Sequence, residues 1–190
     1  SHGMICAEDE IGLGTSHAGI MVLPADAEVG IAAADYFQPY EDIIYEIGLT
    51  PNRMDAMSHW GVARDVCAYL NHHDKQDIKP KLPNGNGFKP DSYRVDNTSL
   101  PVDVKVENEK ACPRYSGVSI ADVTIKESPK WLQQKLKAIG LRPISNIVDI
   151  TNFIQHETGQ PLHAFDADTL SGKKIIVKNL PEGTTFITLD

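Results

Sequence analysis

The sequence of 190 residues has no apolar run approaching the roughly 20 residues that a membrane-spanning helix needs. It opens with polar and acidic residues, so we expect no signal peptide. Cysteine is also scarce, and Cys6, Cys67 and Cys112 form no C-x-x-C motif. This usage favours reduced thiols and a cytoplasmic location, with the cysteines acting as small buried apolar side chains.

Positive charge is in short supply, because the formal net charge is -8. A module that binds nucleic acid by itself is usually basic, and phosphate repels an acidic surface. Any contact with RNA must therefore be confined to a local patch or supplied by other parts of a larger assembly. Composition alone favours a small-molecule enzyme or an interaction domain.

Several common site motifs are missing. The glycines at 12, 14 and 19 lack the strand–loop–helix context of a dinucleotide-binding fingerprint, and there is no P-loop. The His and Asp spacings match no usual zinc motif, so we expect no metal site. Ser145 precedes a predicted helix, where capping explains it, so we predict no Ser-His-Asp triad.

The pattern predicts a mixed α/β (α+β) fold. In the N-terminal 40 residues we expect short β segments, such as 20–23, that look like the end of a truncated region. Residues 43–47 have strand composition, and Asp55 is a candidate N-cap for a helix running to about Leu70. Residues 75–98 are rich in Lys, Pro, Gly and Asn and are predicted to form a linker.

The remaining residues, 99–190, alternate between strand and helix patterns. Strands are predicted at 102–106, 114–125, 174–178 and 185–189. One helix is expected to start at Ser128 and Pro129 and to end at Gly140, and another to run from Ser145 to Gly159. The alternation predicts helices packed on a sheet.

The most suggestive residues for chemistry lie on the second of these helices. At helical spacing, Asp149, Asn152 and His156 share one face. An opposite face of Ile147, Ile150 and Ile154 is expected to point toward the core. Thr151 borders the polar face, and His163 follows on a loop, so the pattern can hold a small polar ligand.

Each of these residues also has a plainer interpretation. His163 could only cap a backbone carbonyl or pack against Phe165. Asn152 could bond to a neighbouring loop, and Asp149 and Asp166 are more often partners of backbone N–H groups. Arg142 either sets the entry to the helix or places a cation near the site.

Two segments carry a family resemblance: VDITNF at 148–153 and GQPLHAFD at 159–166. They are similar to the hallmark segment of the bacterial phenylalanyl-tRNA synthetase β subunit. Further strings match in order along the chain: GMIC at 3–6, EIGLG at 10–14, LTPNR at 49–53, GVARD at 61–65 and CPRYSG at 112–117. The resemblance implies four parts: 1–40, the tail of an oligonucleotide-binding-fold (OB-fold) insert that binds tRNA; 41–74, the second part of a B1-like domain; 75–98, a linker; and 99–190, the first part of the B3/B4 editing module.

The resemblance also implies a function, the hydrolysis of misacylated Tyr-tRNA(Phe). The implied residues fall into two groups: catalytic His163, Asn152 and Thr151, and substrate-binding Arg142, Gln160 and Pro161. A glutamate that the family uses to recognise the tyrosine hydroxyl falls beyond residue 190, so we expect the isolated chain to be inactive.

The implied partners are tRNA(Phe) and an α subunit, in an α2β2 heterotetramer. ATP and Mg²⁺ are implied for the full enzyme on another subunit, and no cofactor is expected in this chain. The alternative is a non-catalytic scaffold or tRNA-docking segment, which the acidic net charge favours. A third hypothesis, an unrelated small-molecule hydrolase, predicts that this chain alone cleaves simple esters.

Overall fold

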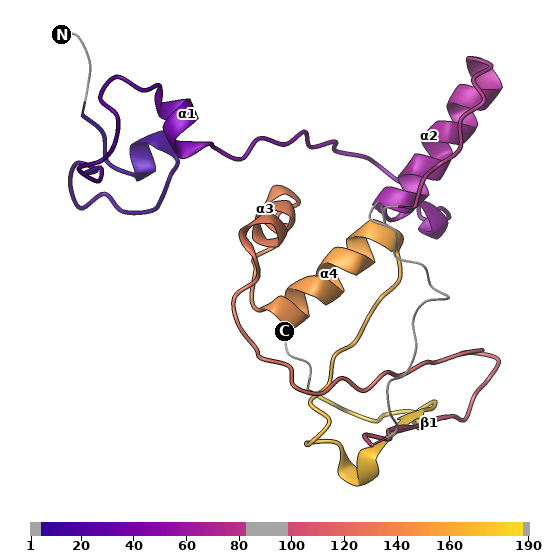
Figure 1. Cartoon of the computed structure of the whole chain (residues 1–190). Helices are drawn as coiled ribbons and strands as arrows, with labels where there is room; N and C mark the ends of the chain where they lie inside the picture. The colour runs from indigo at the N-terminus through magenta and orange to yellow at the C-terminus, as the bar shows by residue number, and fades with distance from the viewer. Residues whose placement is uncertain (1–4, 83–98, 188–190) are drawn as a thin grey trace. The chain divides into compact units, whose positions relative to one another are not determined.

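The computed structural model describes residues 5–82 and 99–187, and its contacts divide the chain into two compact units, 1–45 and 46–190 (Figure 1). No helix among the described residues is long and apolar enough to cross a membrane.

The first unit consists mainly of turns. Between residues 5 and 45 it contains one 3-10 turn, η1 (Asp9–Ile11), and one short helix, α1 (Ala33–Phe37). The Met21 N–H donates to the Cys6 carbonyl at 2.9 Å, and the Glu10 carboxylate accepts from the Ala7 N–H at 2.7 Å. The α+β class is confirmed for the chain, but the β segments expected in the N-terminal 40 residues are wrong: no strand forms among residues 5–40. The apolar run at 20–23 makes one backbone bond to Cys6, through Met21, and forms no strand ladder.

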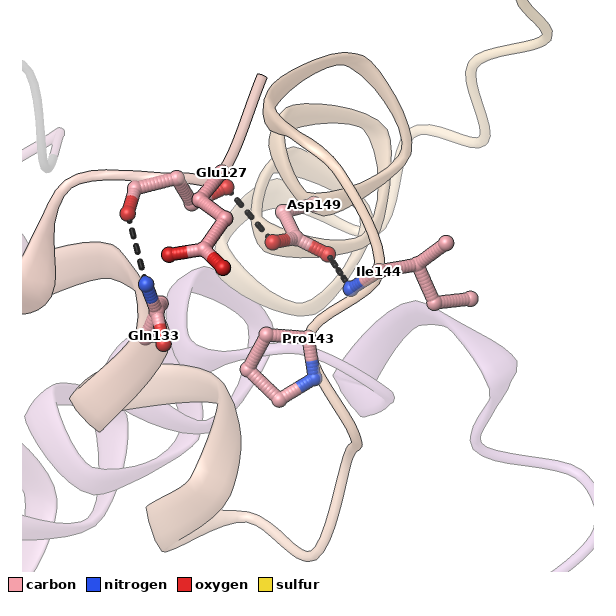
Figure 2. Close-up of a pocket in the computed structure, with 6 residues that line it drawn as sticks. Glu127, Gln133, Pro143, Ile144 and Asp149 are labelled. Atoms are coloured by element: carbon pink, nitrogen blue, oxygen red, sulfur yellow. Dashed lines mark hydrogen bonds between the residues drawn. The ribbon is translucent and has the colours of Figure 1, made fainter.

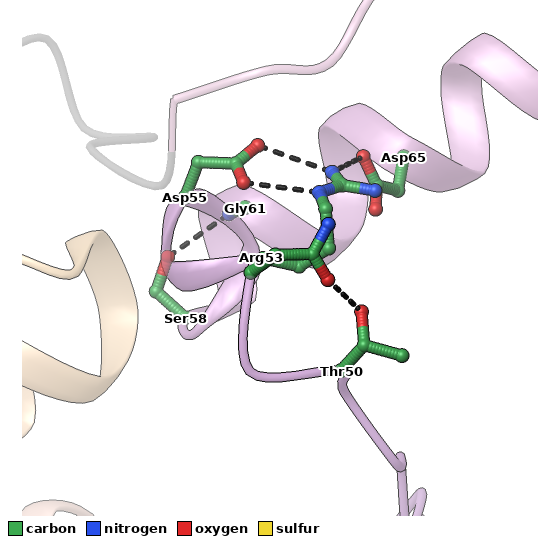
Figure 3. A network of polar contacts seen from close by, with 7 residues as sticks. Thr50, Arg53, Asp55, Ser58, Gly61 and Asp65 are labelled. Carbon is green, nitrogen blue, oxygen red and sulfur yellow. Dashed lines mark hydrogen bonds and ion pairs between the residues drawn. The ribbon is translucent and has the colours of Figure 1, made fainter.

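In the second unit, helix α2 (His59–His73) follows the 3-10 turn η2 (Met54–Ala56). Its N-cap is Ser58, whose hydroxyl accepts from the Gly61 N–H at 2.9 Å, so the expectation for Asp55 is wrong. The carboxylate of Asp55 is instead bound by Arg53, at 3.0 and 3.1 Å. Arg53 also reaches Asp65 at 2.7 Å, so one guanidinium ties the turn before the helix to the helix itself (Figure 3).

The side chain of Asn71 joins the C-terminal end of α2 to the segment that follows it. The amide of Asn71 donates to the Ile78 carbonyl at 2.8 Å and accepts from the Ile78 N–H at 3.0 Å. The start of the predicted linker therefore folds back onto the helix. The rest of that linker, 83–98, lies outside the described residues.

Helices α3 (Lys130–Ala138) and α4 (Asn146–Thr158) pack side by side. Leu132 and Leu136, one turn apart on α3, are 2% and 1% exposed and form the centre of this contact. The rings of Trp131 and Phe153 meet edge to face with centroids 5.6 Å apart. Burial of each leucine stabilises the pair by about 1.5–3 kcal/mol.

A two-stranded parallel sheet joins β1 (Asp103–Val106) to β2 (Lys174–Val177). Asp103 pairs with Lys174 and Val106 with Val177. Parallel neighbours need a long crossover, and here the intervening chain carries α3 and α4. The predicted strands at 102–106 and 174–178 are thereby confirmed.

Other predicted strands are wrong. Residues 43–47 and 114–125 form no strand, and neither do 185–187; residues 188 and 189 lie outside the described part. In the 114–125 segment Val118 and Ile120 are 62% and 74% exposed. The segment has the β-branched residues that strands favour, but it pairs with no neighbouring strand in the described residues. The helices likewise make their main contacts with one another rather than with the sheet.

Gly61 is the tightest point of the α2 contact with its preceding turn. A Cβ there would lie 2.4 Å from the Asp55 carbonyl oxygen and 2.6 Å from the Ala56 Cα. We expect Gly61→Ala to lower the free energy of unfolding by about 1–3 kcal/mol, since backbone must move to accept the methyl group. Gly48→Ala is the matched control, because nothing lies within 4 Å of its added Cβ. Denaturant unfolding of both variants tests this, and equal stabilities would contradict it.

Candidate functional site

The start of α4 is built around a buried carboxylate, not around its N-cap side chain. Ser145 has the extended backbone of an N-cap, but its hydroxyl makes no capping bond. Asp149, in the first turn, is fully buried. Its Oδ1 accepts from the Ile144 N–H at 2.8 Å and its Oδ2 from the Ser128 hydroxyl at 2.5 Å (Figure 2). A carboxylate near a helix N-terminus is also favoured by the helix dipole.

Beside Asp149 lies a hollow of about 110 Å³. It is lined by Glu127, Ser128, Gln133, Pro143, Ile144 and Asp149 (Figure 2). The Gln133 amide donates to the Ser128 carbonyl at 2.7 Å and so ties the first turn of α3 to the segment before it. The residues of the hollow therefore hold the α3–α4 connection together.

A second polar side chain ties α4 to the segment before α3. The Asn146 N–H donates to the Lys126 carbonyl at 2.9 Å. Its side chain accepts from the Lys126 N–H at 3.2 Å and donates to the Thr124 carbonyl at 3.0 Å. The first turn of α4 is thus bonded to three places in residues 124–128.

The residues expected on the polar face of α4 differ in burial. Asp149 is buried, Asn152 is half-buried and His156 is exposed. Asp149 and His156 point in nearly the same direction two turns apart. Asp149 is bonded to Ser128 and to the Ile144 N–H. The expected apolar face is also incomplete, because Ile150 is 47% exposed. The plainer interpretation of Asp149, as a partner of a backbone N–H, is confirmed.

The six residues predicted to form the site fall in three places. Arg142 is exposed between α3 and α4, and Thr151 and Asn152 are half-buried on α4. Gln160, Pro161 and His163 are exposed in the segment that follows α4. None of the six lines the hollow.

Hydrogen bonding separates the five of these residues that have polar side chains into two kinds. The Thr151 hydroxyl donates to the Val148 carbonyl at 2.7 Å, and the Gln160 amide to the Pro161 carbonyl at 3.3 Å. Within the described residues, the side chains of Arg142, Asn152 and His163 make no hydrogen bond or ion pair.

The structure records no contact between Asn152 and His163 in the part it describes. The His163 ring lies beside the ring of Phe165, with centroids 6.5 Å apart. The convergence of Asn152 and His163 on one cleft stays a prediction. Among the described residues, no group of three His, Cys, Asp or Glu side chains gathers closely enough to hold a metal ion.

The far end of α4 rests near the start of α2. Gly159 ends the helix in the left-handed conformation, with φ 81°. A Cβ on Gly159 would lie 3.4 Å from the Ser58 hydroxyl oxygen. Burial raises the pKa of Glu157, and the neighbouring His59 acts in the opposite direction. This end of α4 leads directly into the segment that carries His163.

The raised pKa of Glu157 gives stability a defined dependence on pH. At low pH the carboxyl is protonated in both folded and unfolded chains. As pH rises, the unfolded chain releases the proton first, so stability falls between the ordinary pKa of glutamate, about 4.3, and the higher folded value. We expect Glu157→Gln to raise the melting temperature near pH 7 and to leave it unchanged near pH 3, relative to the parent.

Thermal unfolding at both pH values measures this difference. Glu182→Gln, at an exposed glutamate, controls for the loss of one negative charge. If Glu157→Gln instead lowers the melting temperature at neutral pH, the ionised carboxylate is stabilising and the prediction is wrong.

Residues 111–190, which include α3, α4 and β2, match the family of B3/4 domains. With the fold, this match defines the class: an α+β chain that carries a B3/4 domain. The whole chain is also similar to the phenylalanine–tRNA ligase beta subunits of Bacteroides fragilis, at 56% identity, Bacteroides thetaiotaomicron, at 57%, and Porphyromonas gingivalis, at 50%. All of this chain and 22% of each relative are covered. The chain therefore belongs to the phenylalanine–tRNA ligase beta-subunit family, and it spans about a fifth of the length of these relatives.

Proposed function

We propose that this chain contributes part of an editing site that hydrolyses Tyr-tRNA(Phe). The observation that carries the proposal is the amide of Asn152, which is half-buried on α4 and has no hydrogen-bond partner within the described residues. A polar group held on a rigid helix and left unpaired suits recognition of a polar ligand. Membership of the ligase family supports a ligand of the aminoacyl-tRNA class.

The need for a second site follows from the small difference between phenylalanine and tyrosine. A mainly apolar pocket rejects a substrate that adds one hydroxyl by only about a hundredfold. A separate site that hydrogen-bonds polar parts of the wrong product discriminates further, because each buried polar group left unpaired costs about 1–3 kcal/mol. Hydrolysis at that site removes the product of misacylation.

Ester hydrolysis requires a positioned water and stabilisation of the developing oxyanion. In this proposal Asn152 and His163 hold the aminoacyl ester and the water. Because the Thr151 hydroxyl already donates its hydrogen to the Val148 carbonyl, its oxygen acts toward the substrate as a hydrogen-bond acceptor. Arg142 holds the terminal adenosine or a phosphate, and Gln160 and Pro161 contact the substrate from the segment after α4.

The proposal extends to the complete protein. Its partners are tRNA(Phe) and an α subunit in an α2β2 assembly, and its location is the cytoplasm. Activation of phenylalanine with ATP and Mg²⁺ takes place on the other subunit. With a net charge of -8, this chain binds tRNA only through a local patch, in concert with the rest of the assembly.

Asn152→Ala in the complete assembled enzyme tests the central residue. We expect deacylation of Tyr-tRNA(Phe) to slow about 100- to 1000-fold, since one preorganised hydrogen-bond donor is lost. Charging with phenylalanine stays at the parental rate, because that reaction occurs at another site. Gln155→Ala, an exposed side chain on the same helix, is the control and retains deacylation.

An Asn152→Ala enzyme that deacylates at the parental rate would rule out this role for Asn152. If the parental enzyme itself does not deacylate Tyr-tRNA(Phe), the editing proposal is wrong and the scaffold is the next alternative. That alternative assigns the chain only to subunit packing and tRNA docking, which its acidic charge favours.

His163→Ala tests the imidazole separately. Because the ring is exposed and makes no hydrogen bond among the described residues, its removal leaves no buried group unpaired. We expect unchanged thermal stability together with deacylation slowed about 100-fold or more, the scale of a lost acid–base group. An unchanged deacylation rate removes His163 from the mechanism.

A further inference from the structure

We infer that Asp149 is a positioning residue, whose buried carboxylate fixes helix α4 and the 142–145 loop relative to each other and so sets the placement of Asn152 and Arg142. The inference rests on the proposed function for its catalytic consequence. Its structural part depends only on contacts among described residues.

Asp149 draws its hydrogen bonds from two separate parts of the chain. Ser128 lies 21 residues earlier, just before α3, and Ile144 lies in the loop that leads into α4. Asp149 is 0% exposed and Ser128 is 5% exposed, so water does not replace either bond when it breaks. A buried carboxylate without hydrogen bonds is strongly unfavourable, and this keeps both bonds closed.

Asn146 supplies the second anchor. It precedes Asp149 by three residues, so both side chains leave the same side of the helix, about 60° apart around its axis. Asn146 binds the backbone at Thr124 and Lys126, while Asp149 binds Ser128. Two anchors on one side fix both the rotation of α4 about its axis and its shift along that axis.

The anchored turn is directly continuous with the proposed site. Asn152 is three residues beyond Asp149 on the same helix, so a rotation of α4 moves its amide by the same angle. Arg142 is two residues before Ile144, whose N–H is bound by Asp149. One carboxylate therefore holds the helix that carries Asn152 and the loop that carries Arg142.

The test compares Asp149→Asn with Asp149→Leu in the complete assembled enzyme. Asparagine can accept from the Ile144 N–H through its oxygen and donate to the Ser128 hydroxyl through its nitrogen. Leucine has a similar shape and can do neither. A loss caused by positioning is rescued by asparagine, whereas a loss caused by missing charge is not.

For Asp149→Leu we expect the kcat for Tyr-tRNA(Phe) deacylation to fall about 10- to 100-fold, the scale of a misplacement near 1 Å. KM changes less, and phenylalanine charging is unchanged, which shows that the assembly is intact. Asp149→Asn recovers most of the lost kcat. Glu127→Gln, on an exposed residue lining the same hollow, controls for charge and keeps the parental rate.

Hydrogen exchange at the Ile144 amide is measured on the same proteins. We expect slow exchange in the parent and in Asp149→Asn, and exchange at least tenfold faster in Asp149→Leu. If Asp149→Leu does not fold, Ser128→Ala, which removes one of the two bonds, is measured instead, with a smaller loss expected in the same direction.

Parental kcat in Asp149→Leu, or equal losses in the leucine and asparagine variants, overturns the positioning role in catalysis. Unchanged Ile144 exchange in Asp149→Leu overturns its structural part. If the parental enzyme does not deacylate Tyr-tRNA(Phe), the proposed function is wrong. The structural part of the inference is then tested by hydrogen exchange at Ile144 alone.

Discussion

The arrangement of the candidate site depends on one buried negative charge. Asp149 is enclosed at the start of α4, and a carboxylate there is tolerated only while hydrogen bonds satisfy it. Those bonds come from Ser128 and from the backbone at Ile144. Because the buried carboxylate must be hydrogen-bonded, it joins helix α4, the loop at Ile144 and the segment at Ser128.

From this point the rest of the candidate site follows. Leu132 and Leu136 supply the apolar part of the α3–α4 contact. The hydrogen bonds of Asp149 and Asn146 set the orientation of α4. Apolar burial is not directional, so the leucines alone would permit α4 to rotate. The polar anchors select one orientation, in which the Asn152 amide is left half-buried and unpaired within the described chain.

Local signals in the sequence were sufficient for α2, α3, α4 and one pair of strands, but not for α1. Ser145 and Gly159 mark the ends of α4, and Gly159 has the left-handed backbone that such a helix end favours. The predicted strand at 114–125 failed for a different reason. Strand formation needs a paired backbone elsewhere in the fold, and composition reports only the preference of the segment itself.

The same limit applies to the site. Helical spacing placed Asp149 with Asn152, but it could not show that Ser128 would cover Asp149 from 21 residues away. Ser128 was expected at the start of the first helix, and in the structure its hydroxyl donates to Asp149. Arg142, Asn152 and His163 were identified by family resemblance, and the structure adds that their side chains have no partner in the described residues.

The central claim is that Asn152, Arg142 and His163 serve one aminoacyl ester. It is tested most directly by a crystal structure of the complete enzyme with a non-hydrolysable tyrosyl-adenosine analogue. The account predicts the ester analogue within hydrogen-bond distance of the Asn152 amide and the His163 ring, with the adenosine toward Arg142. An analogue bound at a site that excludes α4 would contradict it.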